Sequence, residues 1–160
     1  MCTGSGILAV TIAKNVENSI VYAADISAKA LDVTKENAKM HKVKIEFLES
    51  DLFQKIEEKN FDIIVSNPPY ITKKDMENIA EEVKKEPQIA LYGGIDGLDF
   101  YKKIADKSKQ YLKSGGQIFF EIGYNQEEKV KTILKENHFK NIKSIKDLQG
   151  IIRVIIGEKE

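Results

Sequence analysis

Residues 61–70 have the sequence FDIIVSNPPY, and this stretch decides the fold. The apolar run over residues 61–65 is typical of a parallel strand that is buried on both faces. Asn67, Pro68, Pro69 and Tyr70 follow where that strand should end. Because ligands of open α/β sheets bind beyond the carboxyl ends of the strands, this position favours a binding loop.

The two prolines predict a rigid loop. A proline fixes its own φ angle and pushes the preceding residue toward extended geometry, so Asn67 and Pro68 should hold their carbonyl oxygens in a fixed row. Such oxygens can accept hydrogen bonds from a planar –NH2 group, and the Tyr70 ring could stack on that group or lie beside a cationic methyl donor. The alternative is that the proline pair only ends a strand, with Tyr70 capping a core edge.

The residues before this loop predict alternating helices and strands. An apolar run over residues 19–25 is followed by Ser27, a residue suited to cap a helix. We expect that helix to place Ala28, Leu31, Lys35 and Ala38 on one face. Val43, Ile45 and Phe47 alternate with charged residues, which predicts a strand near a sheet edge.

The residues after the loop continue the alternation. We predict a short helix near residues 75–83, an irregular segment over 86–94, and a helix over about 98–112 that ends at Ser114-Gly115-Gly116. A strand over 117–122 and a further helix follow, and then runs over 141–147 and 151–156 whose short connection predicts an antiparallel pair. The two helices should bury Tyr101, Ile104, Ala105 and Ser108, and Val130, Ile133 and Leu134. The fold class is α/β with a mainly parallel sheet.

Length and composition set limits on the function. A chain of 160 residues with 42% apolar content predicts one domain over residues 1–160. Its 25 basic and 25 acidic residues balance, so no global charge favours nucleic acid or a membrane surface. The single cysteine, Cys2, cannot form an internal disulfide, and no run is apolar for long enough to span a bilayer. We expect a cytoplasmic monomer without a membrane partner or a metal site.

A second group of candidate residues follows the strands near the amino terminus. Thr3-Gly4-Ser5-Gly6 leads into an apolar helix pattern, so backbone N–H groups at that helix start can face a ligand. Asp25 ends the next strand, nineteen residues after Gly6, where an acid suits ribose hydroxyls. Asp51 could bind an adenine amino group. Each feature has an ordinary structural explanation by itself, but together with the Asn67 loop they occupy the ends of four successive strand positions.

These features resemble the class I S-adenosylmethionine methyltransferases, in which a glycine loop, a ribose-binding acid, an adenine-contacting segment and Asn-Pro-Pro-Tyr occur in this order. More narrowly, the chain resembles the HemK/PrmC family of protein-(glutamine-N5) methyltransferases, from Cys2 to near Ile156. The matching motifs are Val65-Ser66-Asn67-Pro68-Pro69-Tyr70-Ile71, then Glu86-Pro87, Ala90-Leu91, Gly93-Gly94 and Asp96-Gly97-Leu98, and finally Glu121-Ile122-Gly123 with Gln126.

The resemblance implies a Rossmann-like class I methyltransferase fold and methylation of the glutamine side-chain amide in the Gly-Gly-Gln motif of peptide chain release factors. It implies that Asn67, Pro68 and Tyr70 are catalytic and, with Pro69, bind the substrate. It also implies that S-adenosylmethionine contacts Cys2, Thr3, Gly4, Ser5, Gly6, Asp25, Ile26, Asp51, Leu52 and Asn67.

Two features of the family lie upstream of anything in this sequence: a helical amino-terminal domain, and a first strand between the strands ending at Asp25 and Asn67. We therefore expect those two strands to lack a ladder partner and the chain to be a fragment. The rival functions are an adenine-N6 methyltransferase, whose flipped base presents the same –NH2 group, and an inactive fragment or binding module. His41 and His138 are predicted to be surface residues, and Cys2 a small packing residue.

Overall fold

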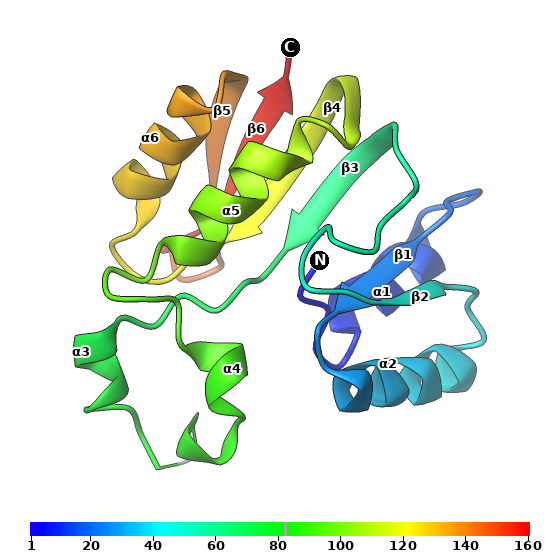
Figure 1. Cartoon of the computed structure of the whole chain (residues 1–160), viewed down its shortest axis with the longest axis horizontal. Helices are drawn as coiled ribbons and strands as arrows, with labels where there is room; N and C mark the ends of the chain where they lie inside the picture. The colour runs from blue at the N-terminus through cyan, green and yellow to red at the C-terminus, as the bar shows by residue number, and fades with distance from the viewer. Residues whose placement is uncertain (82) are drawn as a thin grey trace. The chain divides into compact units, whose positions relative to one another are not determined.

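The computed structural model describes residues 1–81 and 83–160 (Figure 1). The chain divides into two compact units, Met1–Glu57 and Glu58–Glu160. Among the described residues the strands form two sheets, with strand orders β1-β2 and β3-β4-β6-β5. The assignment of residues 1–160 to one methyltransferase domain stays a prediction.

The first unit alternates helices and strands as predicted. It contains α1 (Ile7–Asn15), β1 (Tyr22–Asp25), α2 (Ala28–His41) and β2 (Glu46–Glu49). The two strands are parallel, and the register runs from Tyr22 facing Glu46 to Asp25 facing Glu49. α2 packs on both strands and on α1. The core is formed by small and branched apolar side chains: Ala9, Val10, Ala23, Ala38 and Ile45.

Helix α2 starts where the sequence predicts, but its buried face is different. Ser27 accepts a hydrogen bond from the Ala30 N–H (3.2 Å) and caps the helix. Ala28 and Lys35 were predicted on the inner face but are exposed. Thr34 is instead fully buried, on the same face as Leu31 and Ala38. The hydroxyl of Thr34 bonds to backbone carbonyls, so its burial leaves no unpaired polar group.

The second unit is built on a four-stranded sheet. Its strands are β3 (Phe61–Ser66), β4 (Leu112–Glu121), β5 (Phe139–Lys146) and β6 (Ile152–Lys159). β3 is parallel to β4, and β6 is antiparallel to both β4 and β5, which confirms the predicted antiparallel final pair. This mixture of a parallel pair with an antiparallel carboxyl-terminal strand is that of the class I methyltransferase fold.

The helices of the second unit are α3 (Lys73–Met76), the 3₁₀ helix η1 (Val83–Lys85), α4 (Gln88–Leu91), α5 (Asp99–Ser108) and α6 (Glu127–Glu136). α5 packs on β4, α6 packs on β5 and β6, and the two helices contact each other (Figure 1). Both bury the side chains that the sequence predicts. At the centre, the rings of Tyr101 and Phe120 meet edge to face, with centroids 5.2 Å apart.

Three predictions for the helices of the second unit are wrong. One is the irregular segment expected over residues 86–94, because this segment contains the helix α4. The helix expected over residues 98–112 ends at Ser108, and Ser114-Gly115-Gly116 lies inside β4 instead of ending a helix. Gly115 has φ +74°, and the pairing of β4 with β3 shifts register there, so the glycines form a bulge. The helix expected over residues 75–83 is also absent: α3 ends at Met76, η1 begins at Val83, and residue 82 lies outside the described residues.

Strands β1 and β3 each lie at the edge of their sheet. Among the named strands of the described residues, β1 pairs with β2 and β3 pairs with β4, and the Thr3 N–H also donates to the Ala24 carbonyl of β1 (3.0 Å). The expectation that these two strands lack a ladder partner stays a prediction. The prediction that β3 is buried on both faces is wrong. Its side chains alternate, and Ile64 and Ser66 are buried whereas Ile63 is 53% exposed.

No helix among the described parts of the chain has both the length and the apolar character needed to cross a membrane.

Candidate functional site

The glycine loop of the first unit leads into α1 and depends on left-handed backbone at two glycines. Gly4 has φ +55° and Gly6 has φ +81°. A Cβ on Gly6 would lie 2.3 Å from Cγ2 of Thr34, so only glycine lets the loop approach α2 this closely, whereas the same position at Gly4 faces open space. α1 begins without a side-chain cap, which leaves its first N–H groups available to a ligand.

Two side chains of α2 hold this loop in place. Thr34 Oγ1 donates to the Gly4 carbonyl (2.9 Å), and Asn37 Nδ2 donates to the Ser5 carbonyl (2.8 Å). The two residues lie three apart and therefore share one face of the helix. Neither residue was predicted from the sequence. The available signal was a polar residue, Thr34, within the apolar stripe of α2.

Asp25 lies at the end of β1 and binds the backbone on both sides. Its Oδ2 accepts from the Gly4 N–H (2.8 Å), and its Oδ1 accepts from the Ser27 N–H (2.9 Å). A carboxylate offers about four acceptor positions, so two remain for other donors. Asp25 therefore fixes the glycine loop to the start of α2 and can still bind hydroxyl groups.

The segment after β2 is hydrogen-bonded to the end of β1. The Ser50 N–H donates to the Asp25 carbonyl (2.9 Å), and Ser50 Oγ donates to the Leu52 carbonyl (2.8 Å). Asp51 is exposed and accepts from Gln54 Nε2 (3.1 Å), and Leu52 adopts φ +49°. The structure thus gathers the predicted cofactor residues of the first unit at the carboxyl ends of β1 and β2.

The other residues predicted to contact the cofactor lie near the glycine loop and Asp25, except for Asn67. Cys2 has φ +52° and is partly buried, in agreement with a packing role. The Thr3 N–H donates to the Ala24 carbonyl (3.0 Å), and Ile26 is 48% exposed beside Asp25. His41 and His138 are both exposed, as predicted. Asn67, also predicted to contact the cofactor, belongs to the second unit.

In the second unit, the Asn-Pro-Pro-Tyr loop starts where β3 ends. Asn67 is exposed, whereas Pro68 and Pro69 are buried. Neither the Asn67 side chain nor the Pro68 carbonyl forms a hydrogen bond with any residue that the structure describes. Both oxygens are therefore available as acceptors for a ligand, on a loop whose prolines are anchored in the protein.

Tyr70 is packed against three glycines from distant parts of the sequence. A Cβ on Gly93 would lie 2.6 Å from the Tyr70 Cα, one on Gly97 would lie 2.3 Å from the Tyr70 carbonyl oxygen, and one on Gly123 would lie 2.8 Å from the ring. Two backbone hydrogen bonds hold the next residue in the same place: the Ile71 N–H donates to the Leu91 carbonyl (2.9 Å), and the Ile71 carbonyl accepts from the Gly93 N–H (2.9 Å). The three motifs singled out in the sequence thus meet at Tyr70.

A buried amide, that of Gln126, joins the same three loops. Its Nε2 donates to the carbonyls of Tyr70 (3.1 Å) and Gly97 (3.3 Å), and its Oε1 accepts from the Gly123 N–H (3.0 Å) and the Tyr101 hydroxyl (3.4 Å). In the sequence, Gln126 stands out only as part of the motif that begins at Glu121-Ile122-Gly123. Its partners lie 56, 29, 3 and 25 positions away, so no local pattern could reveal them.

The tyrosines of this site remain neutral. Burial raises the pKa of the Tyr70 phenol above its ordinary value, and the Glu121 carboxylate adds to the rise while Arg153 opposes it. Burial also raises the pKa of Tyr101, whose hydroxyl donates to the Glu121 carbonyl (2.9 Å). Both rings therefore act as uncharged groups near neutral pH.

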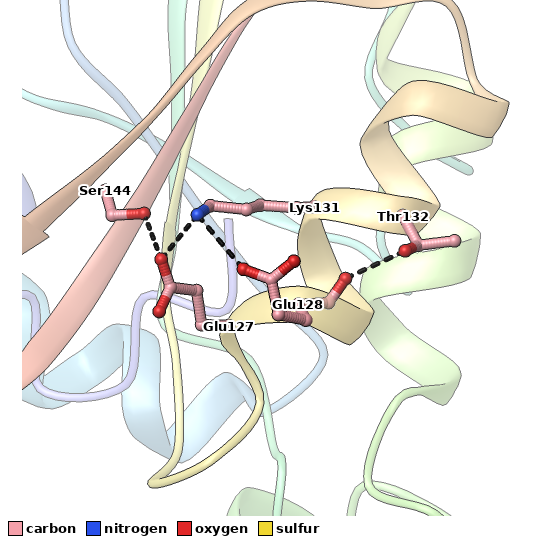
Figure 2. A network of polar contacts seen from close by, with 5 residues as sticks. All are labelled: Glu127, Glu128, Lys131, Thr132 and Ser144. Atoms are coloured by element: carbon pink, nitrogen blue, oxygen red, sulfur yellow. Dashed lines mark hydrogen bonds and ion pairs between the residues drawn. The ribbon is translucent and has the colours of Figure 1, made fainter.

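Next to Gln126, a charged network fastens α6 to β5 (Figure 2). Ser144 Oγ and Lys131 Nζ both donate to Glu127 Oε1, at 2.6 and 2.5 Å, and Lys131 also donates to Glu128. Lys131 and Ser144 lower the pKa of the Glu127 carboxyl. A cavity of about 320 Å³ beside this network is lined by residues that include Tyr124 and Glu127, but not by Asn67, Pro68 or Tyr70. The candidate site is therefore the exposed loop and not this cavity.

Comparison with known proteins agrees with these motifs. The chain is 43% identical over 160 residues to a protein of Fusobacterium nucleatum named release factor glutamine methyltransferase, an alignment that covers 98% of this chain and 45% of that protein. The chain spans about half the length of the curated relatives of this name. The resemblance predicted from the sequence is confirmed.

Solved structures support the fold. A methyltransferase from Pyrococcus furiosus superposes with a TM-score of 0.73 at 18% identity, over 98% of this chain and 71% of that one. A 16S rRNA guanine-N2 methyltransferase from Thermus thermophilus, solved with AdoMet and guanosine, gives 0.68 at 20% identity, over 100% and 36% of the two chains. The sequence model of the methyltransferase small domain matches residues 1–95. The chain therefore belongs to the methyltransferase small domain family and has the class I methyltransferase fold.

Proposed function

We propose that this chain transfers a methyl group from S-adenosylmethionine to the side-chain amide nitrogen (N5) of the glutamine in the Gly-Gly-Gln motif of peptide chain release factors. The observation that carries the proposal is the pair of free acceptors, Asn67 Oδ1 and the Pro68 carbonyl, on a loop held rigidly at Tyr70. The names of the similar proteins support the choice of glutamine as the substrate.

The residues of the first unit suit the cofactor. The Gly4 backbone in left-handed geometry leaves open space over the loop, and the uncapped start of α1 suits a carboxylate. Asp25 would accept hydrogen bonds from ribose hydroxyls with the positions that its backbone bonds leave free, and Asp51 would bind the adenine amino group. S-adenosylmethionine would supply an electrophilic methyl group on a sulfonium; its S–CH3 bond would break as the N–CH3 bond forms, and one amide hydrogen would leave as a proton to solvent.

In the second unit, the free acceptors match the two hydrogens of a primary amide. Asn67 Oδ1 and the Pro68 oxygen would each accept one of these hydrogens, and the neutral Tyr70 ring would pack on the amide plane. An amide nitrogen is a poor nucleophile because its lone pair is delocalised into the carbonyl. Acceptors that favour departure from planarity bind the transition state better than the ground state, and orientation provides much of the remaining acceleration.

The test is methyl transfer by the purified chain. We expect labelled methyl groups from S-adenosylmethionine to reach a release factor with Gly-Gly-Gln, and not its matched variant in which that glutamine is replaced by glutamate, which has no amide nitrogen. Transfer to DNA or RNA oligonucleotides instead would assign the chain to adenine-N6 methylation. Cofactor binding without transfer to either substrate would make it a binding module. A cytoplasmic location and a monomeric state belong to the same proposal.

A further inference from the structure

We propose that Gln126 is a positioning residue that holds the Asn-Pro-Pro-Tyr loop in its methyl-accepting geometry, an inference that rests on the proposed function of that loop. Gln126 is only 7% exposed, and its side chain makes hydrogen bonds with four partners. Among the described residues, the partner of Gln126 within the loop is the Tyr70 carbonyl and not the Asn67 side chain, so Gln126 would act through the backbone of the loop.

The orientation of the Gln126 amide follows from its partners. The Gly123 N–H can only donate, whereas the carbonyls of Tyr70 and Gly97 can only accept, so Oε1 must face Gly123 and Nε2 must face the other two. Nε2 has two carbonyl acceptors, and Oε1 has the Gly123 N–H and the Tyr101 hydroxyl as donors. A rotated or shortened side chain would leave buried backbone groups unpaired.

The glycines around Tyr70 make room for this amide. A Cβ on Gly97 would lie 2.8 Å from Gln126 Nε2, and one on Gly123 would lie 2.9 Å from its Oε1. Both glycines also touch Tyr70 itself, at the carbonyl oxygen and at the ring. Gly97 and Gly123 therefore leave the space that both Tyr70 and the Gln126 amide occupy.

Gln126 also connects the loop to a rigid element. Its carbonyl accepts from the Val130 N–H (3.0 Å) at the start of α6, whose Val130 and Leu134 are fully buried in the core. Glu127, the next residue, fastens the same end of α6 to β5 through Ser144 (Figure 2). The hydrogen bond from Gln126 therefore links the Tyr70 carbonyl to the fixed start of α6. Tyr70 lies three positions after Asn67 in the chain.

The variant Gln126→Glu isolates the donor side of this amide. It keeps the acceptor for Gly123 but directs a carboxylate oxygen at two carbonyls, Tyr70 and Gly97. We expect kcat for methyl transfer to fall about tenfold or more at pH 8, since small misplacements of a positioned group can cost up to about 100-fold. The dissociation constant for S-adenosylmethionine should stay within about twofold. Lowering the pH should restore part of kcat, because a protonated carboxyl can again donate.

The control is Glu127→Gln, which loosens the same turn of α6 by removing the charged bonds to Lys131 and Ser144 but does not touch the loop. A second readout, independent of catalysis, is hydrogen exchange at the Ile71 amide, which donates to the Leu91 carbonyl next to Tyr70. Exchange there should accelerate in Gln126→Glu and in the uncharged variant Gln126→Met, and stay unchanged in Glu127→Gln. The methionine variant provides the test if the carboxyl variant does not fold.

Equal losses of kcat in the Gln126 and Glu127 variants, or unchanged exchange at Ile71 in both Gln126 variants, would overturn the inference. If the unmodified chain methylates no Gly-Gly-Gln protein, the proposed function fails by itself. Hydrogen exchange then still decides whether Gln126 holds the loop.

Discussion

The close approach of Gly6 to Thr34 allows a quantitative test of how the glycine loop is held. In the variant Gly6→Ala, the new Cβ would lie 2.3 Å from Thr34 Cγ2 and 2.9 Å from both Thr34 Cβ and Oγ1. Carbon atoms pack at about 3.5–4.0 Å, so the first contact is too short by more than 1 Å. Overpacking of this kind typically costs about 1–3 kcal/mol.

The backbone adds a second cost. Gly6 has φ +81°, and a residue with a Cβ loses about 1–2 kcal/mol in left-handed geometry. We therefore expect Gly6→Ala to lower the free energy of unfolding by about 2–5 kcal/mol, the sum of the two costs. Gly4→Ala is the matched control: it carries the backbone cost at φ +55° but meets no atom within 4 Å, so its loss should be about 1–2 kcal/mol.

A double-mutant cycle separates the two costs. Thr34→Ser removes the Cγ2 atom but keeps the hydroxyl that donates to the Gly4 carbonyl. In this background Gly6→Ala should be less harmful by about 1 kcal/mol or more, well above the roughly 0.3–0.5 kcal/mol expected between independent sites. Urea unfolding followed by circular dichroism measures all four variants. Additive effects of Gly6→Ala and Thr34→Ser, or an equal loss in Gly4→Ala, would refute the reasoning.

Three further predictions address the site and its support. Asn67→Ala should reduce turnover more than cofactor affinity, while Asp25→Ala should chiefly weaken S-adenosylmethionine binding measured by calorimetry, because Asp25 also fixes the Gly4 N–H. Equal loss of both functions in each variant would contradict this division. Tyr101→Phe should destabilise the protein by about 1 kcal/mol in urea unfolding, because it removes the buried hydroxyl that donates to the Glu121 carbonyl (2.9 Å) and lies 3.4 Å from Gln126 Oε1. No change would mean that this hydroxyl contributes nothing to stability. Because Lys131 and Ser144 lower the pKa of Glu127 from 4.5, its ionised form stabilises the fold above that pH, and this contribution is lost as the pH falls through the folded pKa. The difference in Tm between the unmodified chain and Glu127→Gln should therefore be present at pH 7 and shrink as the pH falls below 4.5, and a constant difference would argue against the ion pair.

Local patterns in the sequence were sufficient for the alternation of the longer helices and strands and for the loops that follow the strands, but not for the short helices between residues 73 and 91. The Ser27 cap, the apolar stripes of α5 and α6, and the glycine loop before α1 depend on residues within a few positions of one another. Prolines that restrict their own backbone made the Asn67 loop recognisable for the same reason. These features can be recognised in the sequence because the interactions that produce them join residues only a few positions apart.

The tertiary structure decided what the loops contact. On α2, Thr34 is buried and Lys35 is not, because the Thr34 hydroxyl bonds to the Gly4 carbonyl of the glycine loop and to the Ala30 carbonyl of its own helix. The glycines after α5 form a bulge in β4 because the neighbouring strand fixes the register. Three glycines and the amide of Gln126 meet at Tyr70 from positions up to 56 residues apart. Close packing and the pairing of buried polar groups are relations between distant residues, and only the folded chain brings those residues together.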